Sequence, residues 1–256
     1  MDTLAERWAR LEPHVQMFGP DDGVARPAVL LFHGCGGLRP HLPLYADAAV
    51  KAGWRAFVVD SFGHRGWSRE FALTFVCTGV FLQGAQRAGD VLASIWGVLK
   101  RPDVDPTAFA LAGWSHGSWS MMDLMTMPLA RAGEADIADP DASLLDTLKG
   151  LFLVYPYGHY PALSRTRDWV RTPRSLAVIA SRDHVTAKAA ATRLYDRPRA
   201  SGAEIEIWNV DATHAFDEPT AQFPMQYDPL LTAEAHRRFQ GFLEGLLKDG
   251  ARTRAA

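Results

Sequence analysis

The sequence predicts an α/β fold in which a mostly parallel sheet is flanked by helices. Short apolar runs alternate along the chain with segments whose apolar residues have helical spacing. Crossover helices between successive strands produce a parallel sheet. The expected strands are residues 14–18, 28–32, 55–59, 109–112, 151–154, 176–180 and 204–210.

The expected helices lie between these strands. Residues 88–99 carry an apolar stripe at helical spacing, and Pro102 prevents the helix from continuing. Residues 118–127 contain neither Pro nor Gly, and residues 186–195 leave room for a helix between two strands. A second apolar stripe predicts the last helix over residues 233–248.

Length and composition predict one α/β domain over residues 1–256. A chain of 256 residues that is 48% hydrophobic can bury one sizeable core. The net charge of −2 gives no indication of a nucleic acid or an anionic membrane as partner. The first ten residues lack the apolar core of a signal peptide, and no run approaches the roughly 18 apolar residues of a membrane span. We therefore expect a cytoplasmic protein in which Cys35 and Cys77 are reduced thiols.

The pattern Gly-x-Ser-x-Gly at residues 113–117 predicts a nucleophilic serine. It directly follows the apolar run 109–112 and precedes a segment that can be helical. Between a strand and a helix, this pentapeptide forms a nucleophile elbow, and its glycines allow the tight turn. The pattern also occurs by chance in many chains, so the preceding strand is what favours Ser115 as the nucleophile.

A glycine-rich segment, His-Gly-Cys-Gly-Gly at residues 33–37, follows the apolar run 28–32. In serine hydrolases of this topology, a backbone N–H of such a loop and the N–H after the nucleophile form the oxyanion hole. Here these donors would be the N–H groups of Cys35 and His116. A dinucleotide-binding loop would need a third glycine at the position of Arg39, and a phosphate-binding loop would need a Gly-Lys-Ser/Thr sequence that is missing here.

A serine nucleophile needs a general base, and His214 is the candidate. It follows the strand-like run 204–210, in the kind of loop that carries the base in this chain order. His116 adjoins the serine and cannot turn back onto its neighbour. His236 is expected on the solvated face of the last helix.

The base in turn needs an acid to orient it, and Asp183 is the candidate. It comes just after the run 176–180 and precedes His214, with room for one helix and one strand between them. Asp211 is the competitor, but its position three residues before His214 is better suited to capping a turn. Asp168 follows no clear strand and is expected to be a surface charge.

In their order and spacing these motifs resemble the dienelactone hydrolase family of α/β-hydrolases. The resemblance implies the α/β-hydrolase fold, a mostly parallel sheet of about eight strands flanked by helices, and a triad of Ser115, His214 and Asp183. The namesake enzymes use a cysteine nucleophile where this chain has serine, which favours ester chemistry over the namesake substrate. The resemblance spans about residues 13–248 and rests on residues 33–38, 60–66, 113–117, 183 and 214–216.

The expected function is a serine hydrolase that cleaves a small ester, lactone or thioester through an acyl-enzyme on Ser115. The alternatives are a peptidase or an acyltransferase on the same triad, and a non-catalytic ligand-binding protein of the same fold. The substrate pocket is expected to be walled by Trp114, Tyr155 and Phe216, which flank motif residues. No cofactor or metal is expected, because the nine histidines show no ligand spacing such as His-Glu-x-x-His.

Two long connections, residues 60–86 and 127–148, are candidate lid or cap segments over the carboxyl edge of the sheet. The first is rich in aromatic residues and the second in acidic ones. The sequence does not decide whether Arg39, Arg65 or Arg69 binds a substrate carboxylate. It indicates no particular oligomeric state.

Overall fold

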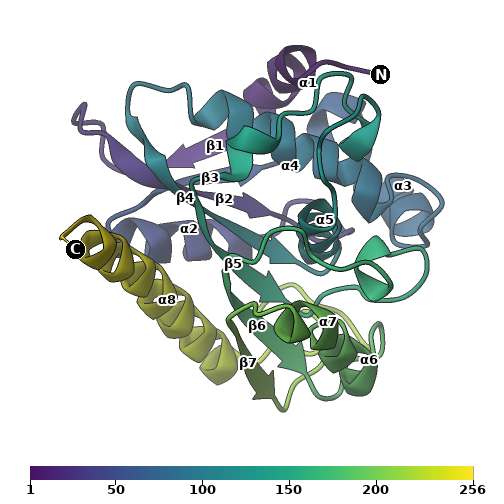
Figure 1. The fold of residues 1–256 in the computed structure, drawn as a ribbon. Coiled ribbons are helices and arrows are strands. Elements are labelled where there is room, and N and C mark those ends of the chain that lie inside the picture. The colour runs from purple at the N-terminus through teal and green to yellow at the C-terminus, as the bar shows by residue number, and fades with distance from the viewer. Residues whose placement is uncertain (256) are drawn as a thin grey trace.

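The computed structural model describes the backbone of residues 1–255 and the side chains up to Asp249. Its seven strands form one sheet in the order β1-β3-β2-β4-β5-β6-β7. Strand β1 runs antiparallel to β3, and all other neighbouring strands are parallel (Figure 1). The strands are β1 (Val15–Phe18), β2 (Arg26–Phe32), β3 (Arg55–Val59), β4 (Val104–Trp114), β5 (Leu148–Val154), β6 (Arg174–Ala180) and β7 (Ile205–Val210).

All seven strands expected from the sequence are present, and the described residues form one strand fewer than the eight or so that the family resemblance implied. The expected helix over residues 186–195 is present as the shorter α6 (Lys188–Arg193), whereas α1 (Leu4–Leu11), α2 (His41–Lys51), α3 (Arg69–Phe71) and α7 (Asp196–Ala200) have no counterpart among the expected helices. The helices are α1 (Leu4–Leu11), α2 (His41–Lys51), α3 (Arg69–Phe71), α4 (Gly84–Val98), α5 (His116–Met125), α6 (Lys188–Arg193), α7 (Asp196–Ala200) and α8 (Pro229–Ala255). Among the described residues, none of the helices combines the length and the hydrophobicity that crossing a bilayer requires.

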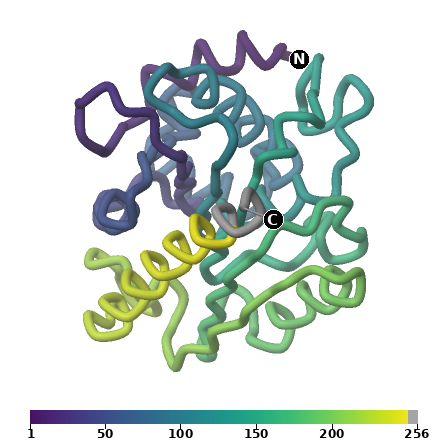
Figure 2. The backbone as a smooth tube through the Cα atoms, turned by 60° about the vertical axis from the view of Figure 1, so that its left-hand side comes forward, coloured from purple at the N-terminus to yellow at the C-terminus, as the bar shows by residue number. Residues whose placement is uncertain are grey.

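Two hydrophobic cores cover the two faces of the sheet, and β2 contributes to both. Leu30 and Phe32 pack into the core under α1, α4 and α5, whereas Val29 and Leu31 pack into the core under α2 and α8. Figures 1 and 2 show α1 and α8 on different sides of the molecule. Because both faces of β2 are buried, its sequence is a continuous apolar run rather than an alternation of polar and apolar residues.

The parallel register brings the carboxyl ends of six strands, β2 to β7, to one edge of the sheet. The loops that begin after these ends therefore open side by side, at the edge where α/β proteins bind ligands. Near these ends, the paired residues are Phe32 with Gly113, Trp114 with Val154, Val154 with Val178, and Ala180 with Val210.

The candidate lid segment 127–148 lies over α4 and near the N-terminus. Its Ile137 forms an isolated β-bridge with Asp2, and the carbonyl oxygen of Ala135 would lie 2.2 Å from a Cβ atom at Gly89 of α4. This close approach depends on the glycine. The segment is therefore tied to the outer face of α4.

Helix α1 packs on α4 at Gly97. A Cβ atom at this position would lie 2.1 Å from ring atoms of Trp8, which is 8% exposed. Gly97→Ala should therefore lower the free energy of unfolding by about 1–3 kcal/mol, because the buried indole must shift. Urea denaturation monitored by fluorescence measures the change.

Gly241→Ala is the matched control, because nothing lies within 4 Å of a Cβ atom at that position of α8. This substitution should raise stability by up to about 1 kcal/mol through helix propensity. Equal effects of the two substitutions would contradict this account of the contact between α1 and α4.

Candidate active site

Ser115 stands at the turn between β4 and α5, with φ of 50° and ψ of −107°. This conformation is rarely populated by a non-glycine residue and is the strained geometry of a nucleophile elbow. The two glycines of the motif are required by close backbone contacts. A Cβ atom would lie 2.6 Å from the Ser118 nitrogen at Gly113, and 2.2 Å from the Phe32 carbonyl oxygen at Gly117.

A row of hydrogen bonds connects the three residues that the sequence singled out. Ser115 Oγ lies 3.0 Å from His214 Nε2, and His214 Nδ1 lies 2.7 Å from Asp183 Oδ2. The other carboxylate oxygen of Asp183 accepts from the backbone N–H groups of Val185 and Thr186, at 2.7 and 3.0 Å. These bonds fix the carboxylate, which orients the imidazole toward the serine. The arrangement is suited to withdrawing a proton from the serine hydroxyl.

The other residues considered for the roles of acid and base have partners outside the triad. Asp211 is 83% exposed and accepts from Ser181 Oγ and Arg182 Nε, both at 3.0 Å. Asp168 is an exposed charge that pairs with Arg197. The expected solvation of His236 is wrong: this ring is half-buried against Tyr45, at 4.3 Å between centroids, because α8 packs on α2.

Cys35 and His116 are the two residues expected to supply the oxyanion donors. Cys35 lines the same cavity as Ser115, and His116 directly follows Ser115 in the chain. The Gly37 N–H donates to the Gly34 carbonyl oxygen at 3.2 Å, and this turn does not use the N–H of Cys35. A Cβ atom at Gly34 would lie 3.5 Å from the Ser115 Cβ atom, so the loop passes close over the nucleophile. His116 is the first residue of α5, where a backbone N–H has no intrahelical acceptor.

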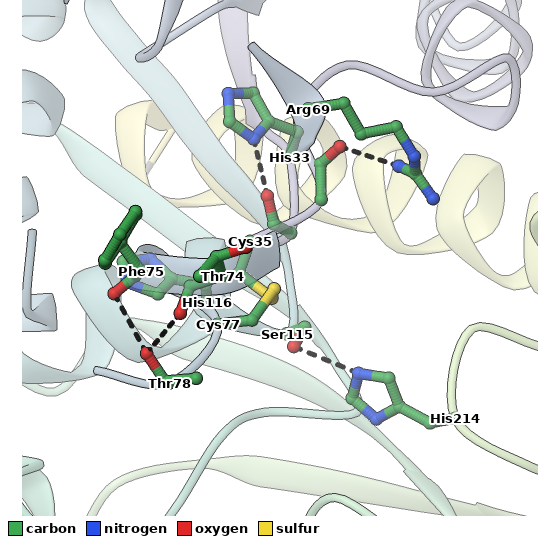
Figure 3. The surroundings of a disulfide bond; sticks show 12 residues. His33, Cys35, Arg69, Thr74, Phe75, Cys77, Thr78, Ser115, His116 and His214 are labelled. Carbon is green, nitrogen blue, oxygen red and sulfur yellow. Dashed lines mark hydrogen bonds between the residues drawn. A yellow bond between two sulfur atoms is a disulfide. The ribbon is translucent and has the colours of Figure 1, made fainter. Parts of the chain in front are cut away.

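The prediction of two reduced thiols is wrong, because Cys35 and Cys77 form a disulfide across 42 residues of sequence. The pair forms because α3 and the following π-helical turn, Ala72–Val76, bring Cys77 against the loop that follows β2 (Figure 3). Two cysteines do not define a disulfide pattern in sequence, so their pairing depends on how these loops fold together.

A cavity of about 310 Å³ opens at Ser115 and His214. Trp114 and Tyr155 line it, as the sequence predicted. Phe216 is not a wall residue: it is fully buried behind Tyr155, at 6.0 Å between ring centroids. The candidate lid 60–86 contributes to the wall, whereas no described residue of 127–148 does. Other lining residues include Arg69, Leu73, Val185, Ala221, Phe223 and Met225.

The three arginines considered as ligands of a substrate carboxylate differ in their position and their partners, and only Arg39 and Arg69 line the cavity. Arg39 forms an ion pair with Glu218, and Arg65 pairs with the buried Asp90 at 2.7 Å. Arg69 lines the cavity and donates to the Gly36 carbonyl oxygen at 2.8 Å, without an ion pair to any residue whose side chain is described. No set of three or more His, Cys, Asp or Glu residues within the described region is arranged to hold a metal ion.

Arg87 is a buried cation behind the site that the sequence analysis missed. It donates to the His33 carbonyl oxygen at 2.8 Å and to Ser61 Oγ at 3.1 Å, and it lies 3.1 Å from His116 Nδ1. Burial lowers the pKa of the guanidinium to about 9. Burial and then the charge of Arg87 hold the pKa of His116 well below its usual value, so its neutral ring accepts the hydrogen bond. In sequence, Arg87 is one polar residue of an amphipathic helix.

Asp217 is the second buried group that the sequence analysis missed. Its side chain accepts from Tyr45 at 2.8 Å, Trp114 at 2.9 Å and Tyr155 at 2.7 Å. Two of these donors, Trp114 and Tyr155, line the cavity. In the sequence, only its position three residues after His214 points to a place near the site. This position does not show which side chains Asp217 contacts. Asp217 holds the aromatic wall in place from behind.

Removing this acceptor should therefore be costly. Asp217→Ala leaves three buried donors without their partner, at about 1–3 kcal/mol each, so the free energy of unfolding should fall by at least about 3 kcal/mol. Asp217→Asn keeps an acceptor oxygen and should lose less. The exposed Asp211→Ala is the control and should change stability by no more than about 0.5 kcal/mol. Chemical denaturation ranks the three variants, and a similar effect of Asp217→Ala and Asp211→Ala would contradict this role.

Comparison with known proteins agrees with this fold. Among solved structures, three hydrolases illustrate the similarity. Their sequence identities to this chain are low, so the likeness shows a shared fold only. Over 91% of this chain and 92% of that one, it resembles the dienelactone hydrolase-like promiscuous phosphotriesterase P91 from metagenomic libraries, with 15% identity and a TM-score of 0.63. For Est1E from Butyrivibrio proteoclasticus, with ferulic acid bound, the coverages are 91% and 95%, the identity 15% and the TM-score 0.64. Thermogutta terrifontis esterase 2, phosphoramylated by tabun, is similar over 90% of this chain and 88% of that one, with 16% identity and a TM-score of 0.65.

The comparison with curated proteins found no match. The family model, in contrast, covers almost the whole described chain. Residues 14–247 match the model of the dienelactone hydrolase family. The chain therefore belongs to the dienelactone hydrolase family, within the α/β-hydrolase superfamily.

Proposed function

We propose that this protein is a serine hydrolase that cleaves a small ester, lactone or thioester through an acyl-enzyme on Ser115. The observation that carries the proposal is the row of hydrogen bonds from Ser115 through His214 to Asp183, which opens into the cavity. Membership of the dienelactone hydrolase family supports it. The bound ferulic acid of Est1E and the tabun adduct of esterase 2 are also consistent with ester chemistry on this fold.

In the first half-reaction, Ser115 Oγ attacks the carbonyl carbon of the substrate while His214 Nε2 takes the hydroxyl proton. The carbonyl oxygen becomes an oxyanion, which accepts from the N–H groups of Cys35 and His116. When the tetrahedral intermediate collapses, the alcohol or thiol leaves with the proton from His214. Water then attacks the acyl-enzyme by the same steps and releases the acid.

Asp183 supports both half-reactions without taking a proton. Its carboxylate accepts from His214 Nδ1–H, which leaves Nε2 free to act as the base, and it stabilises the imidazolium that forms. The amides of Val185 and Thr186 hold the carboxylate in this orientation.

The cavity suits a small substrate with an apolar group. Its volume is about 310 Å³, at the small end of the range of ligand pockets. Trp114, Leu73, Val185 and Met225 provide apolar surface beside Ser115.

A peptidase or an acyltransferase would use the same acyl-enzyme and differ only in the leaving group or the acceptor. A non-catalytic binding protein of this fold would not need three residues joined in the geometry of a triad. A fluorophosphonate probe separates these classes, because a hydrolase, peptidase or transferase should be labelled on serine and a binding protein should not. A panel of p-nitrophenyl esters of graded chain length, run beside lactones and peptides, then distinguishes the substrates.

Ser115→Ala should lower kcat by about 10³-fold or more on the best ester of such a panel, because the triad acts as a unit. Peptide mapping should find the fluorophosphonate label on Ser115 in the unsubstituted protein. Ser118→Ala is the matched control for labelling, since Ser118 lies one turn into α5 and its hydroxyl donates to the Gly113 carbonyl oxygen. Label on Ser118 or Ser120 would refute the assignment of the nucleophile.

Asp183→Asn should fold normally and lose up to about 10⁴-fold in kcat, because the amide favours the wrong tautomer of His214. Asp211→Asn should lose far less, because Asp211 is exposed and pairs with Arg182. Steady-state kinetics of the two variants, with circular dichroism to check folding, ranks the candidates. The opposite ranking would make Asp211 the acid.

A further inference from the structure

We propose that residues 69–77 clamp the oxyanion loop, residues 33–37, with Cys77 and Arg69 as positioning residues, and that a dithiol lowers kcat by reducing the Cys35–Cys77 disulfide. The proposal rests on the function proposed above, because it concerns how the Cys35 N–H is held for the oxyanion. Two independent contacts carry it: the disulfide and the hydrogen bond from Arg69 to Gly36 (Figure 3).

The oxyanion loop has little internal support. Three of its five residues are glycine, the residue type that loses most backbone freedom on folding, and Gly37 has a φ of +83°. The described bonds within the loop are the turn from Gly37 to Gly34 and the contact of His33 Nδ1 with the Gly34 carbonyl oxygen, at 2.6 Å. An oxyanion donor is effective only when its position is fixed before the charge develops. The loop therefore needs an external support.

The segment 69–77 supplies that support on both sides of the Cys35–Gly36 peptide. The Cys35 side chain is bonded to Cys77, and the Gly36 carbonyl oxygen accepts from Arg69 Nη1 at 2.8 Å. Both contacts come from the same short segment, residues 69–77. Figure 3 shows the disulfide close to Ser115 and His116, with Arg69 on the other side of the loop.

The segment is itself well anchored. Ser68 Oγ caps α3 by accepting from the Phe71 N–H at 3.2 Å, and Ala72 and Val76 are buried in a small cluster with Phe62. Cys35 packs against the same cluster. The clamp therefore joins the glycine-rich oxyanion loop to a helical turn that is packed into a hydrophobic cluster.

Reduction opens this link by ordinary thiol–disulfide exchange. A thiolate of dithiothreitol attacks one sulfur, forms a mixed disulfide and releases the other cysteine as a thiol. Its second thiolate then displaces the remaining cysteine, so that two electrons pass to the protein and the reagent is oxidised to its cyclic disulfide. Both cysteines line the cavity and are partly exposed, so a small dithiol can reach them.

The expected effect is on kcat, because the oxyanion exists only in and near the transition state. Deleting a donor altogether costs about 10²–10³-fold in kcat. Loosening a donor that is still present should cost less, so we expect kcat to fall about tenfold, with KM changed less than about twofold.

The experiment compares oxidised and dithiothreitol-treated protein on the best ester, with thiols counted by alkylation and mass spectrometry. Reoxidation should restore kcat. Cys77→Ser should reproduce the loss and make kcat insensitive to dithiothreitol. Replacing both cysteines by serine should cost no more than Cys77→Ser alone, because either change removes the same bond.

Thr78→Ala is the matched control. Its hydroxyl donates to backbone carbonyls of Thr74 and Phe75 within the segment and does not reach the oxyanion loop. This variant should keep the unsubstituted kcat and the full response to dithiothreitol.

Unchanged kcat after complete reduction, or a loss confined to KM, overturns the clamp. If the reduced protein loses its cooperative unfolding transition, Arg69→Met in the oxidised protein decides instead: a several-fold fall in kcat supports the clamp and an unchanged kcat overturns it. Failure of the proposed function is distinguishable, because Ser115→Ala would then remain active. If Ser115→Ala is inactive and the kcat of the unsubstituted protein does not change on reduction, the clamp is refuted and the proposed function stands.

Discussion

Helix α5 begins in direct backbone contact with the end of β2, and this approach is possible because residue 117 has no side chain. A Cβ atom there would lie 2.2 Å from the Phe32 carbonyl oxygen. The contact brings the turn at Ser115 against the loop that begins at His33, although the two are about 80 residues apart in sequence. The strained backbone of Ser115 is held by the same packing. The rest of the candidate site is arranged around this junction of β2, β4 and α5.

Two buried charged side chains stabilise the junction from opposite faces of the sheet. Arg87 of α4 reaches the His33 carbonyl and the ring of His116, beside both proposed oxyanion donors. Asp217 accepts from Trp114 and Tyr155 on the other face, where these rings line the cavity. Hydrogen bonds are stronger in such a low-dielectric interior, and an unpaired polar group there is costly. Both networks therefore give the site one well-defined arrangement.

The connection after β3 is both a wall of the cavity and an exposed apolar surface. It closes one side of the cavity, carries Arg69 and Cys77, and exposes Leu73, Phe75 and Phe81 to solvent. Disulfides persist in oxidising surroundings and are reduced in the cytosol. A disulfide at the proposed oxyanion loop therefore makes the redox state of the surroundings relevant to the chemistry at Ser115.

The sequence by itself determined the seven strands, the elbow at Ser115 and the order in which Asp183 and His214 follow it. These are local features: apolar runs and short motifs depend on neighbouring residues, and the parallel register brings their ends to one edge. Tertiary structure alone decided that Cys35 pairs with Cys77, that Phe216 lies behind Tyr155, and that Arg87 and Asp217 are buried at the site. Each of these depends on which way a side chain points and on segments far apart in sequence. No local pattern encodes such contacts, because they form only when the loops at the sheet edge pack together.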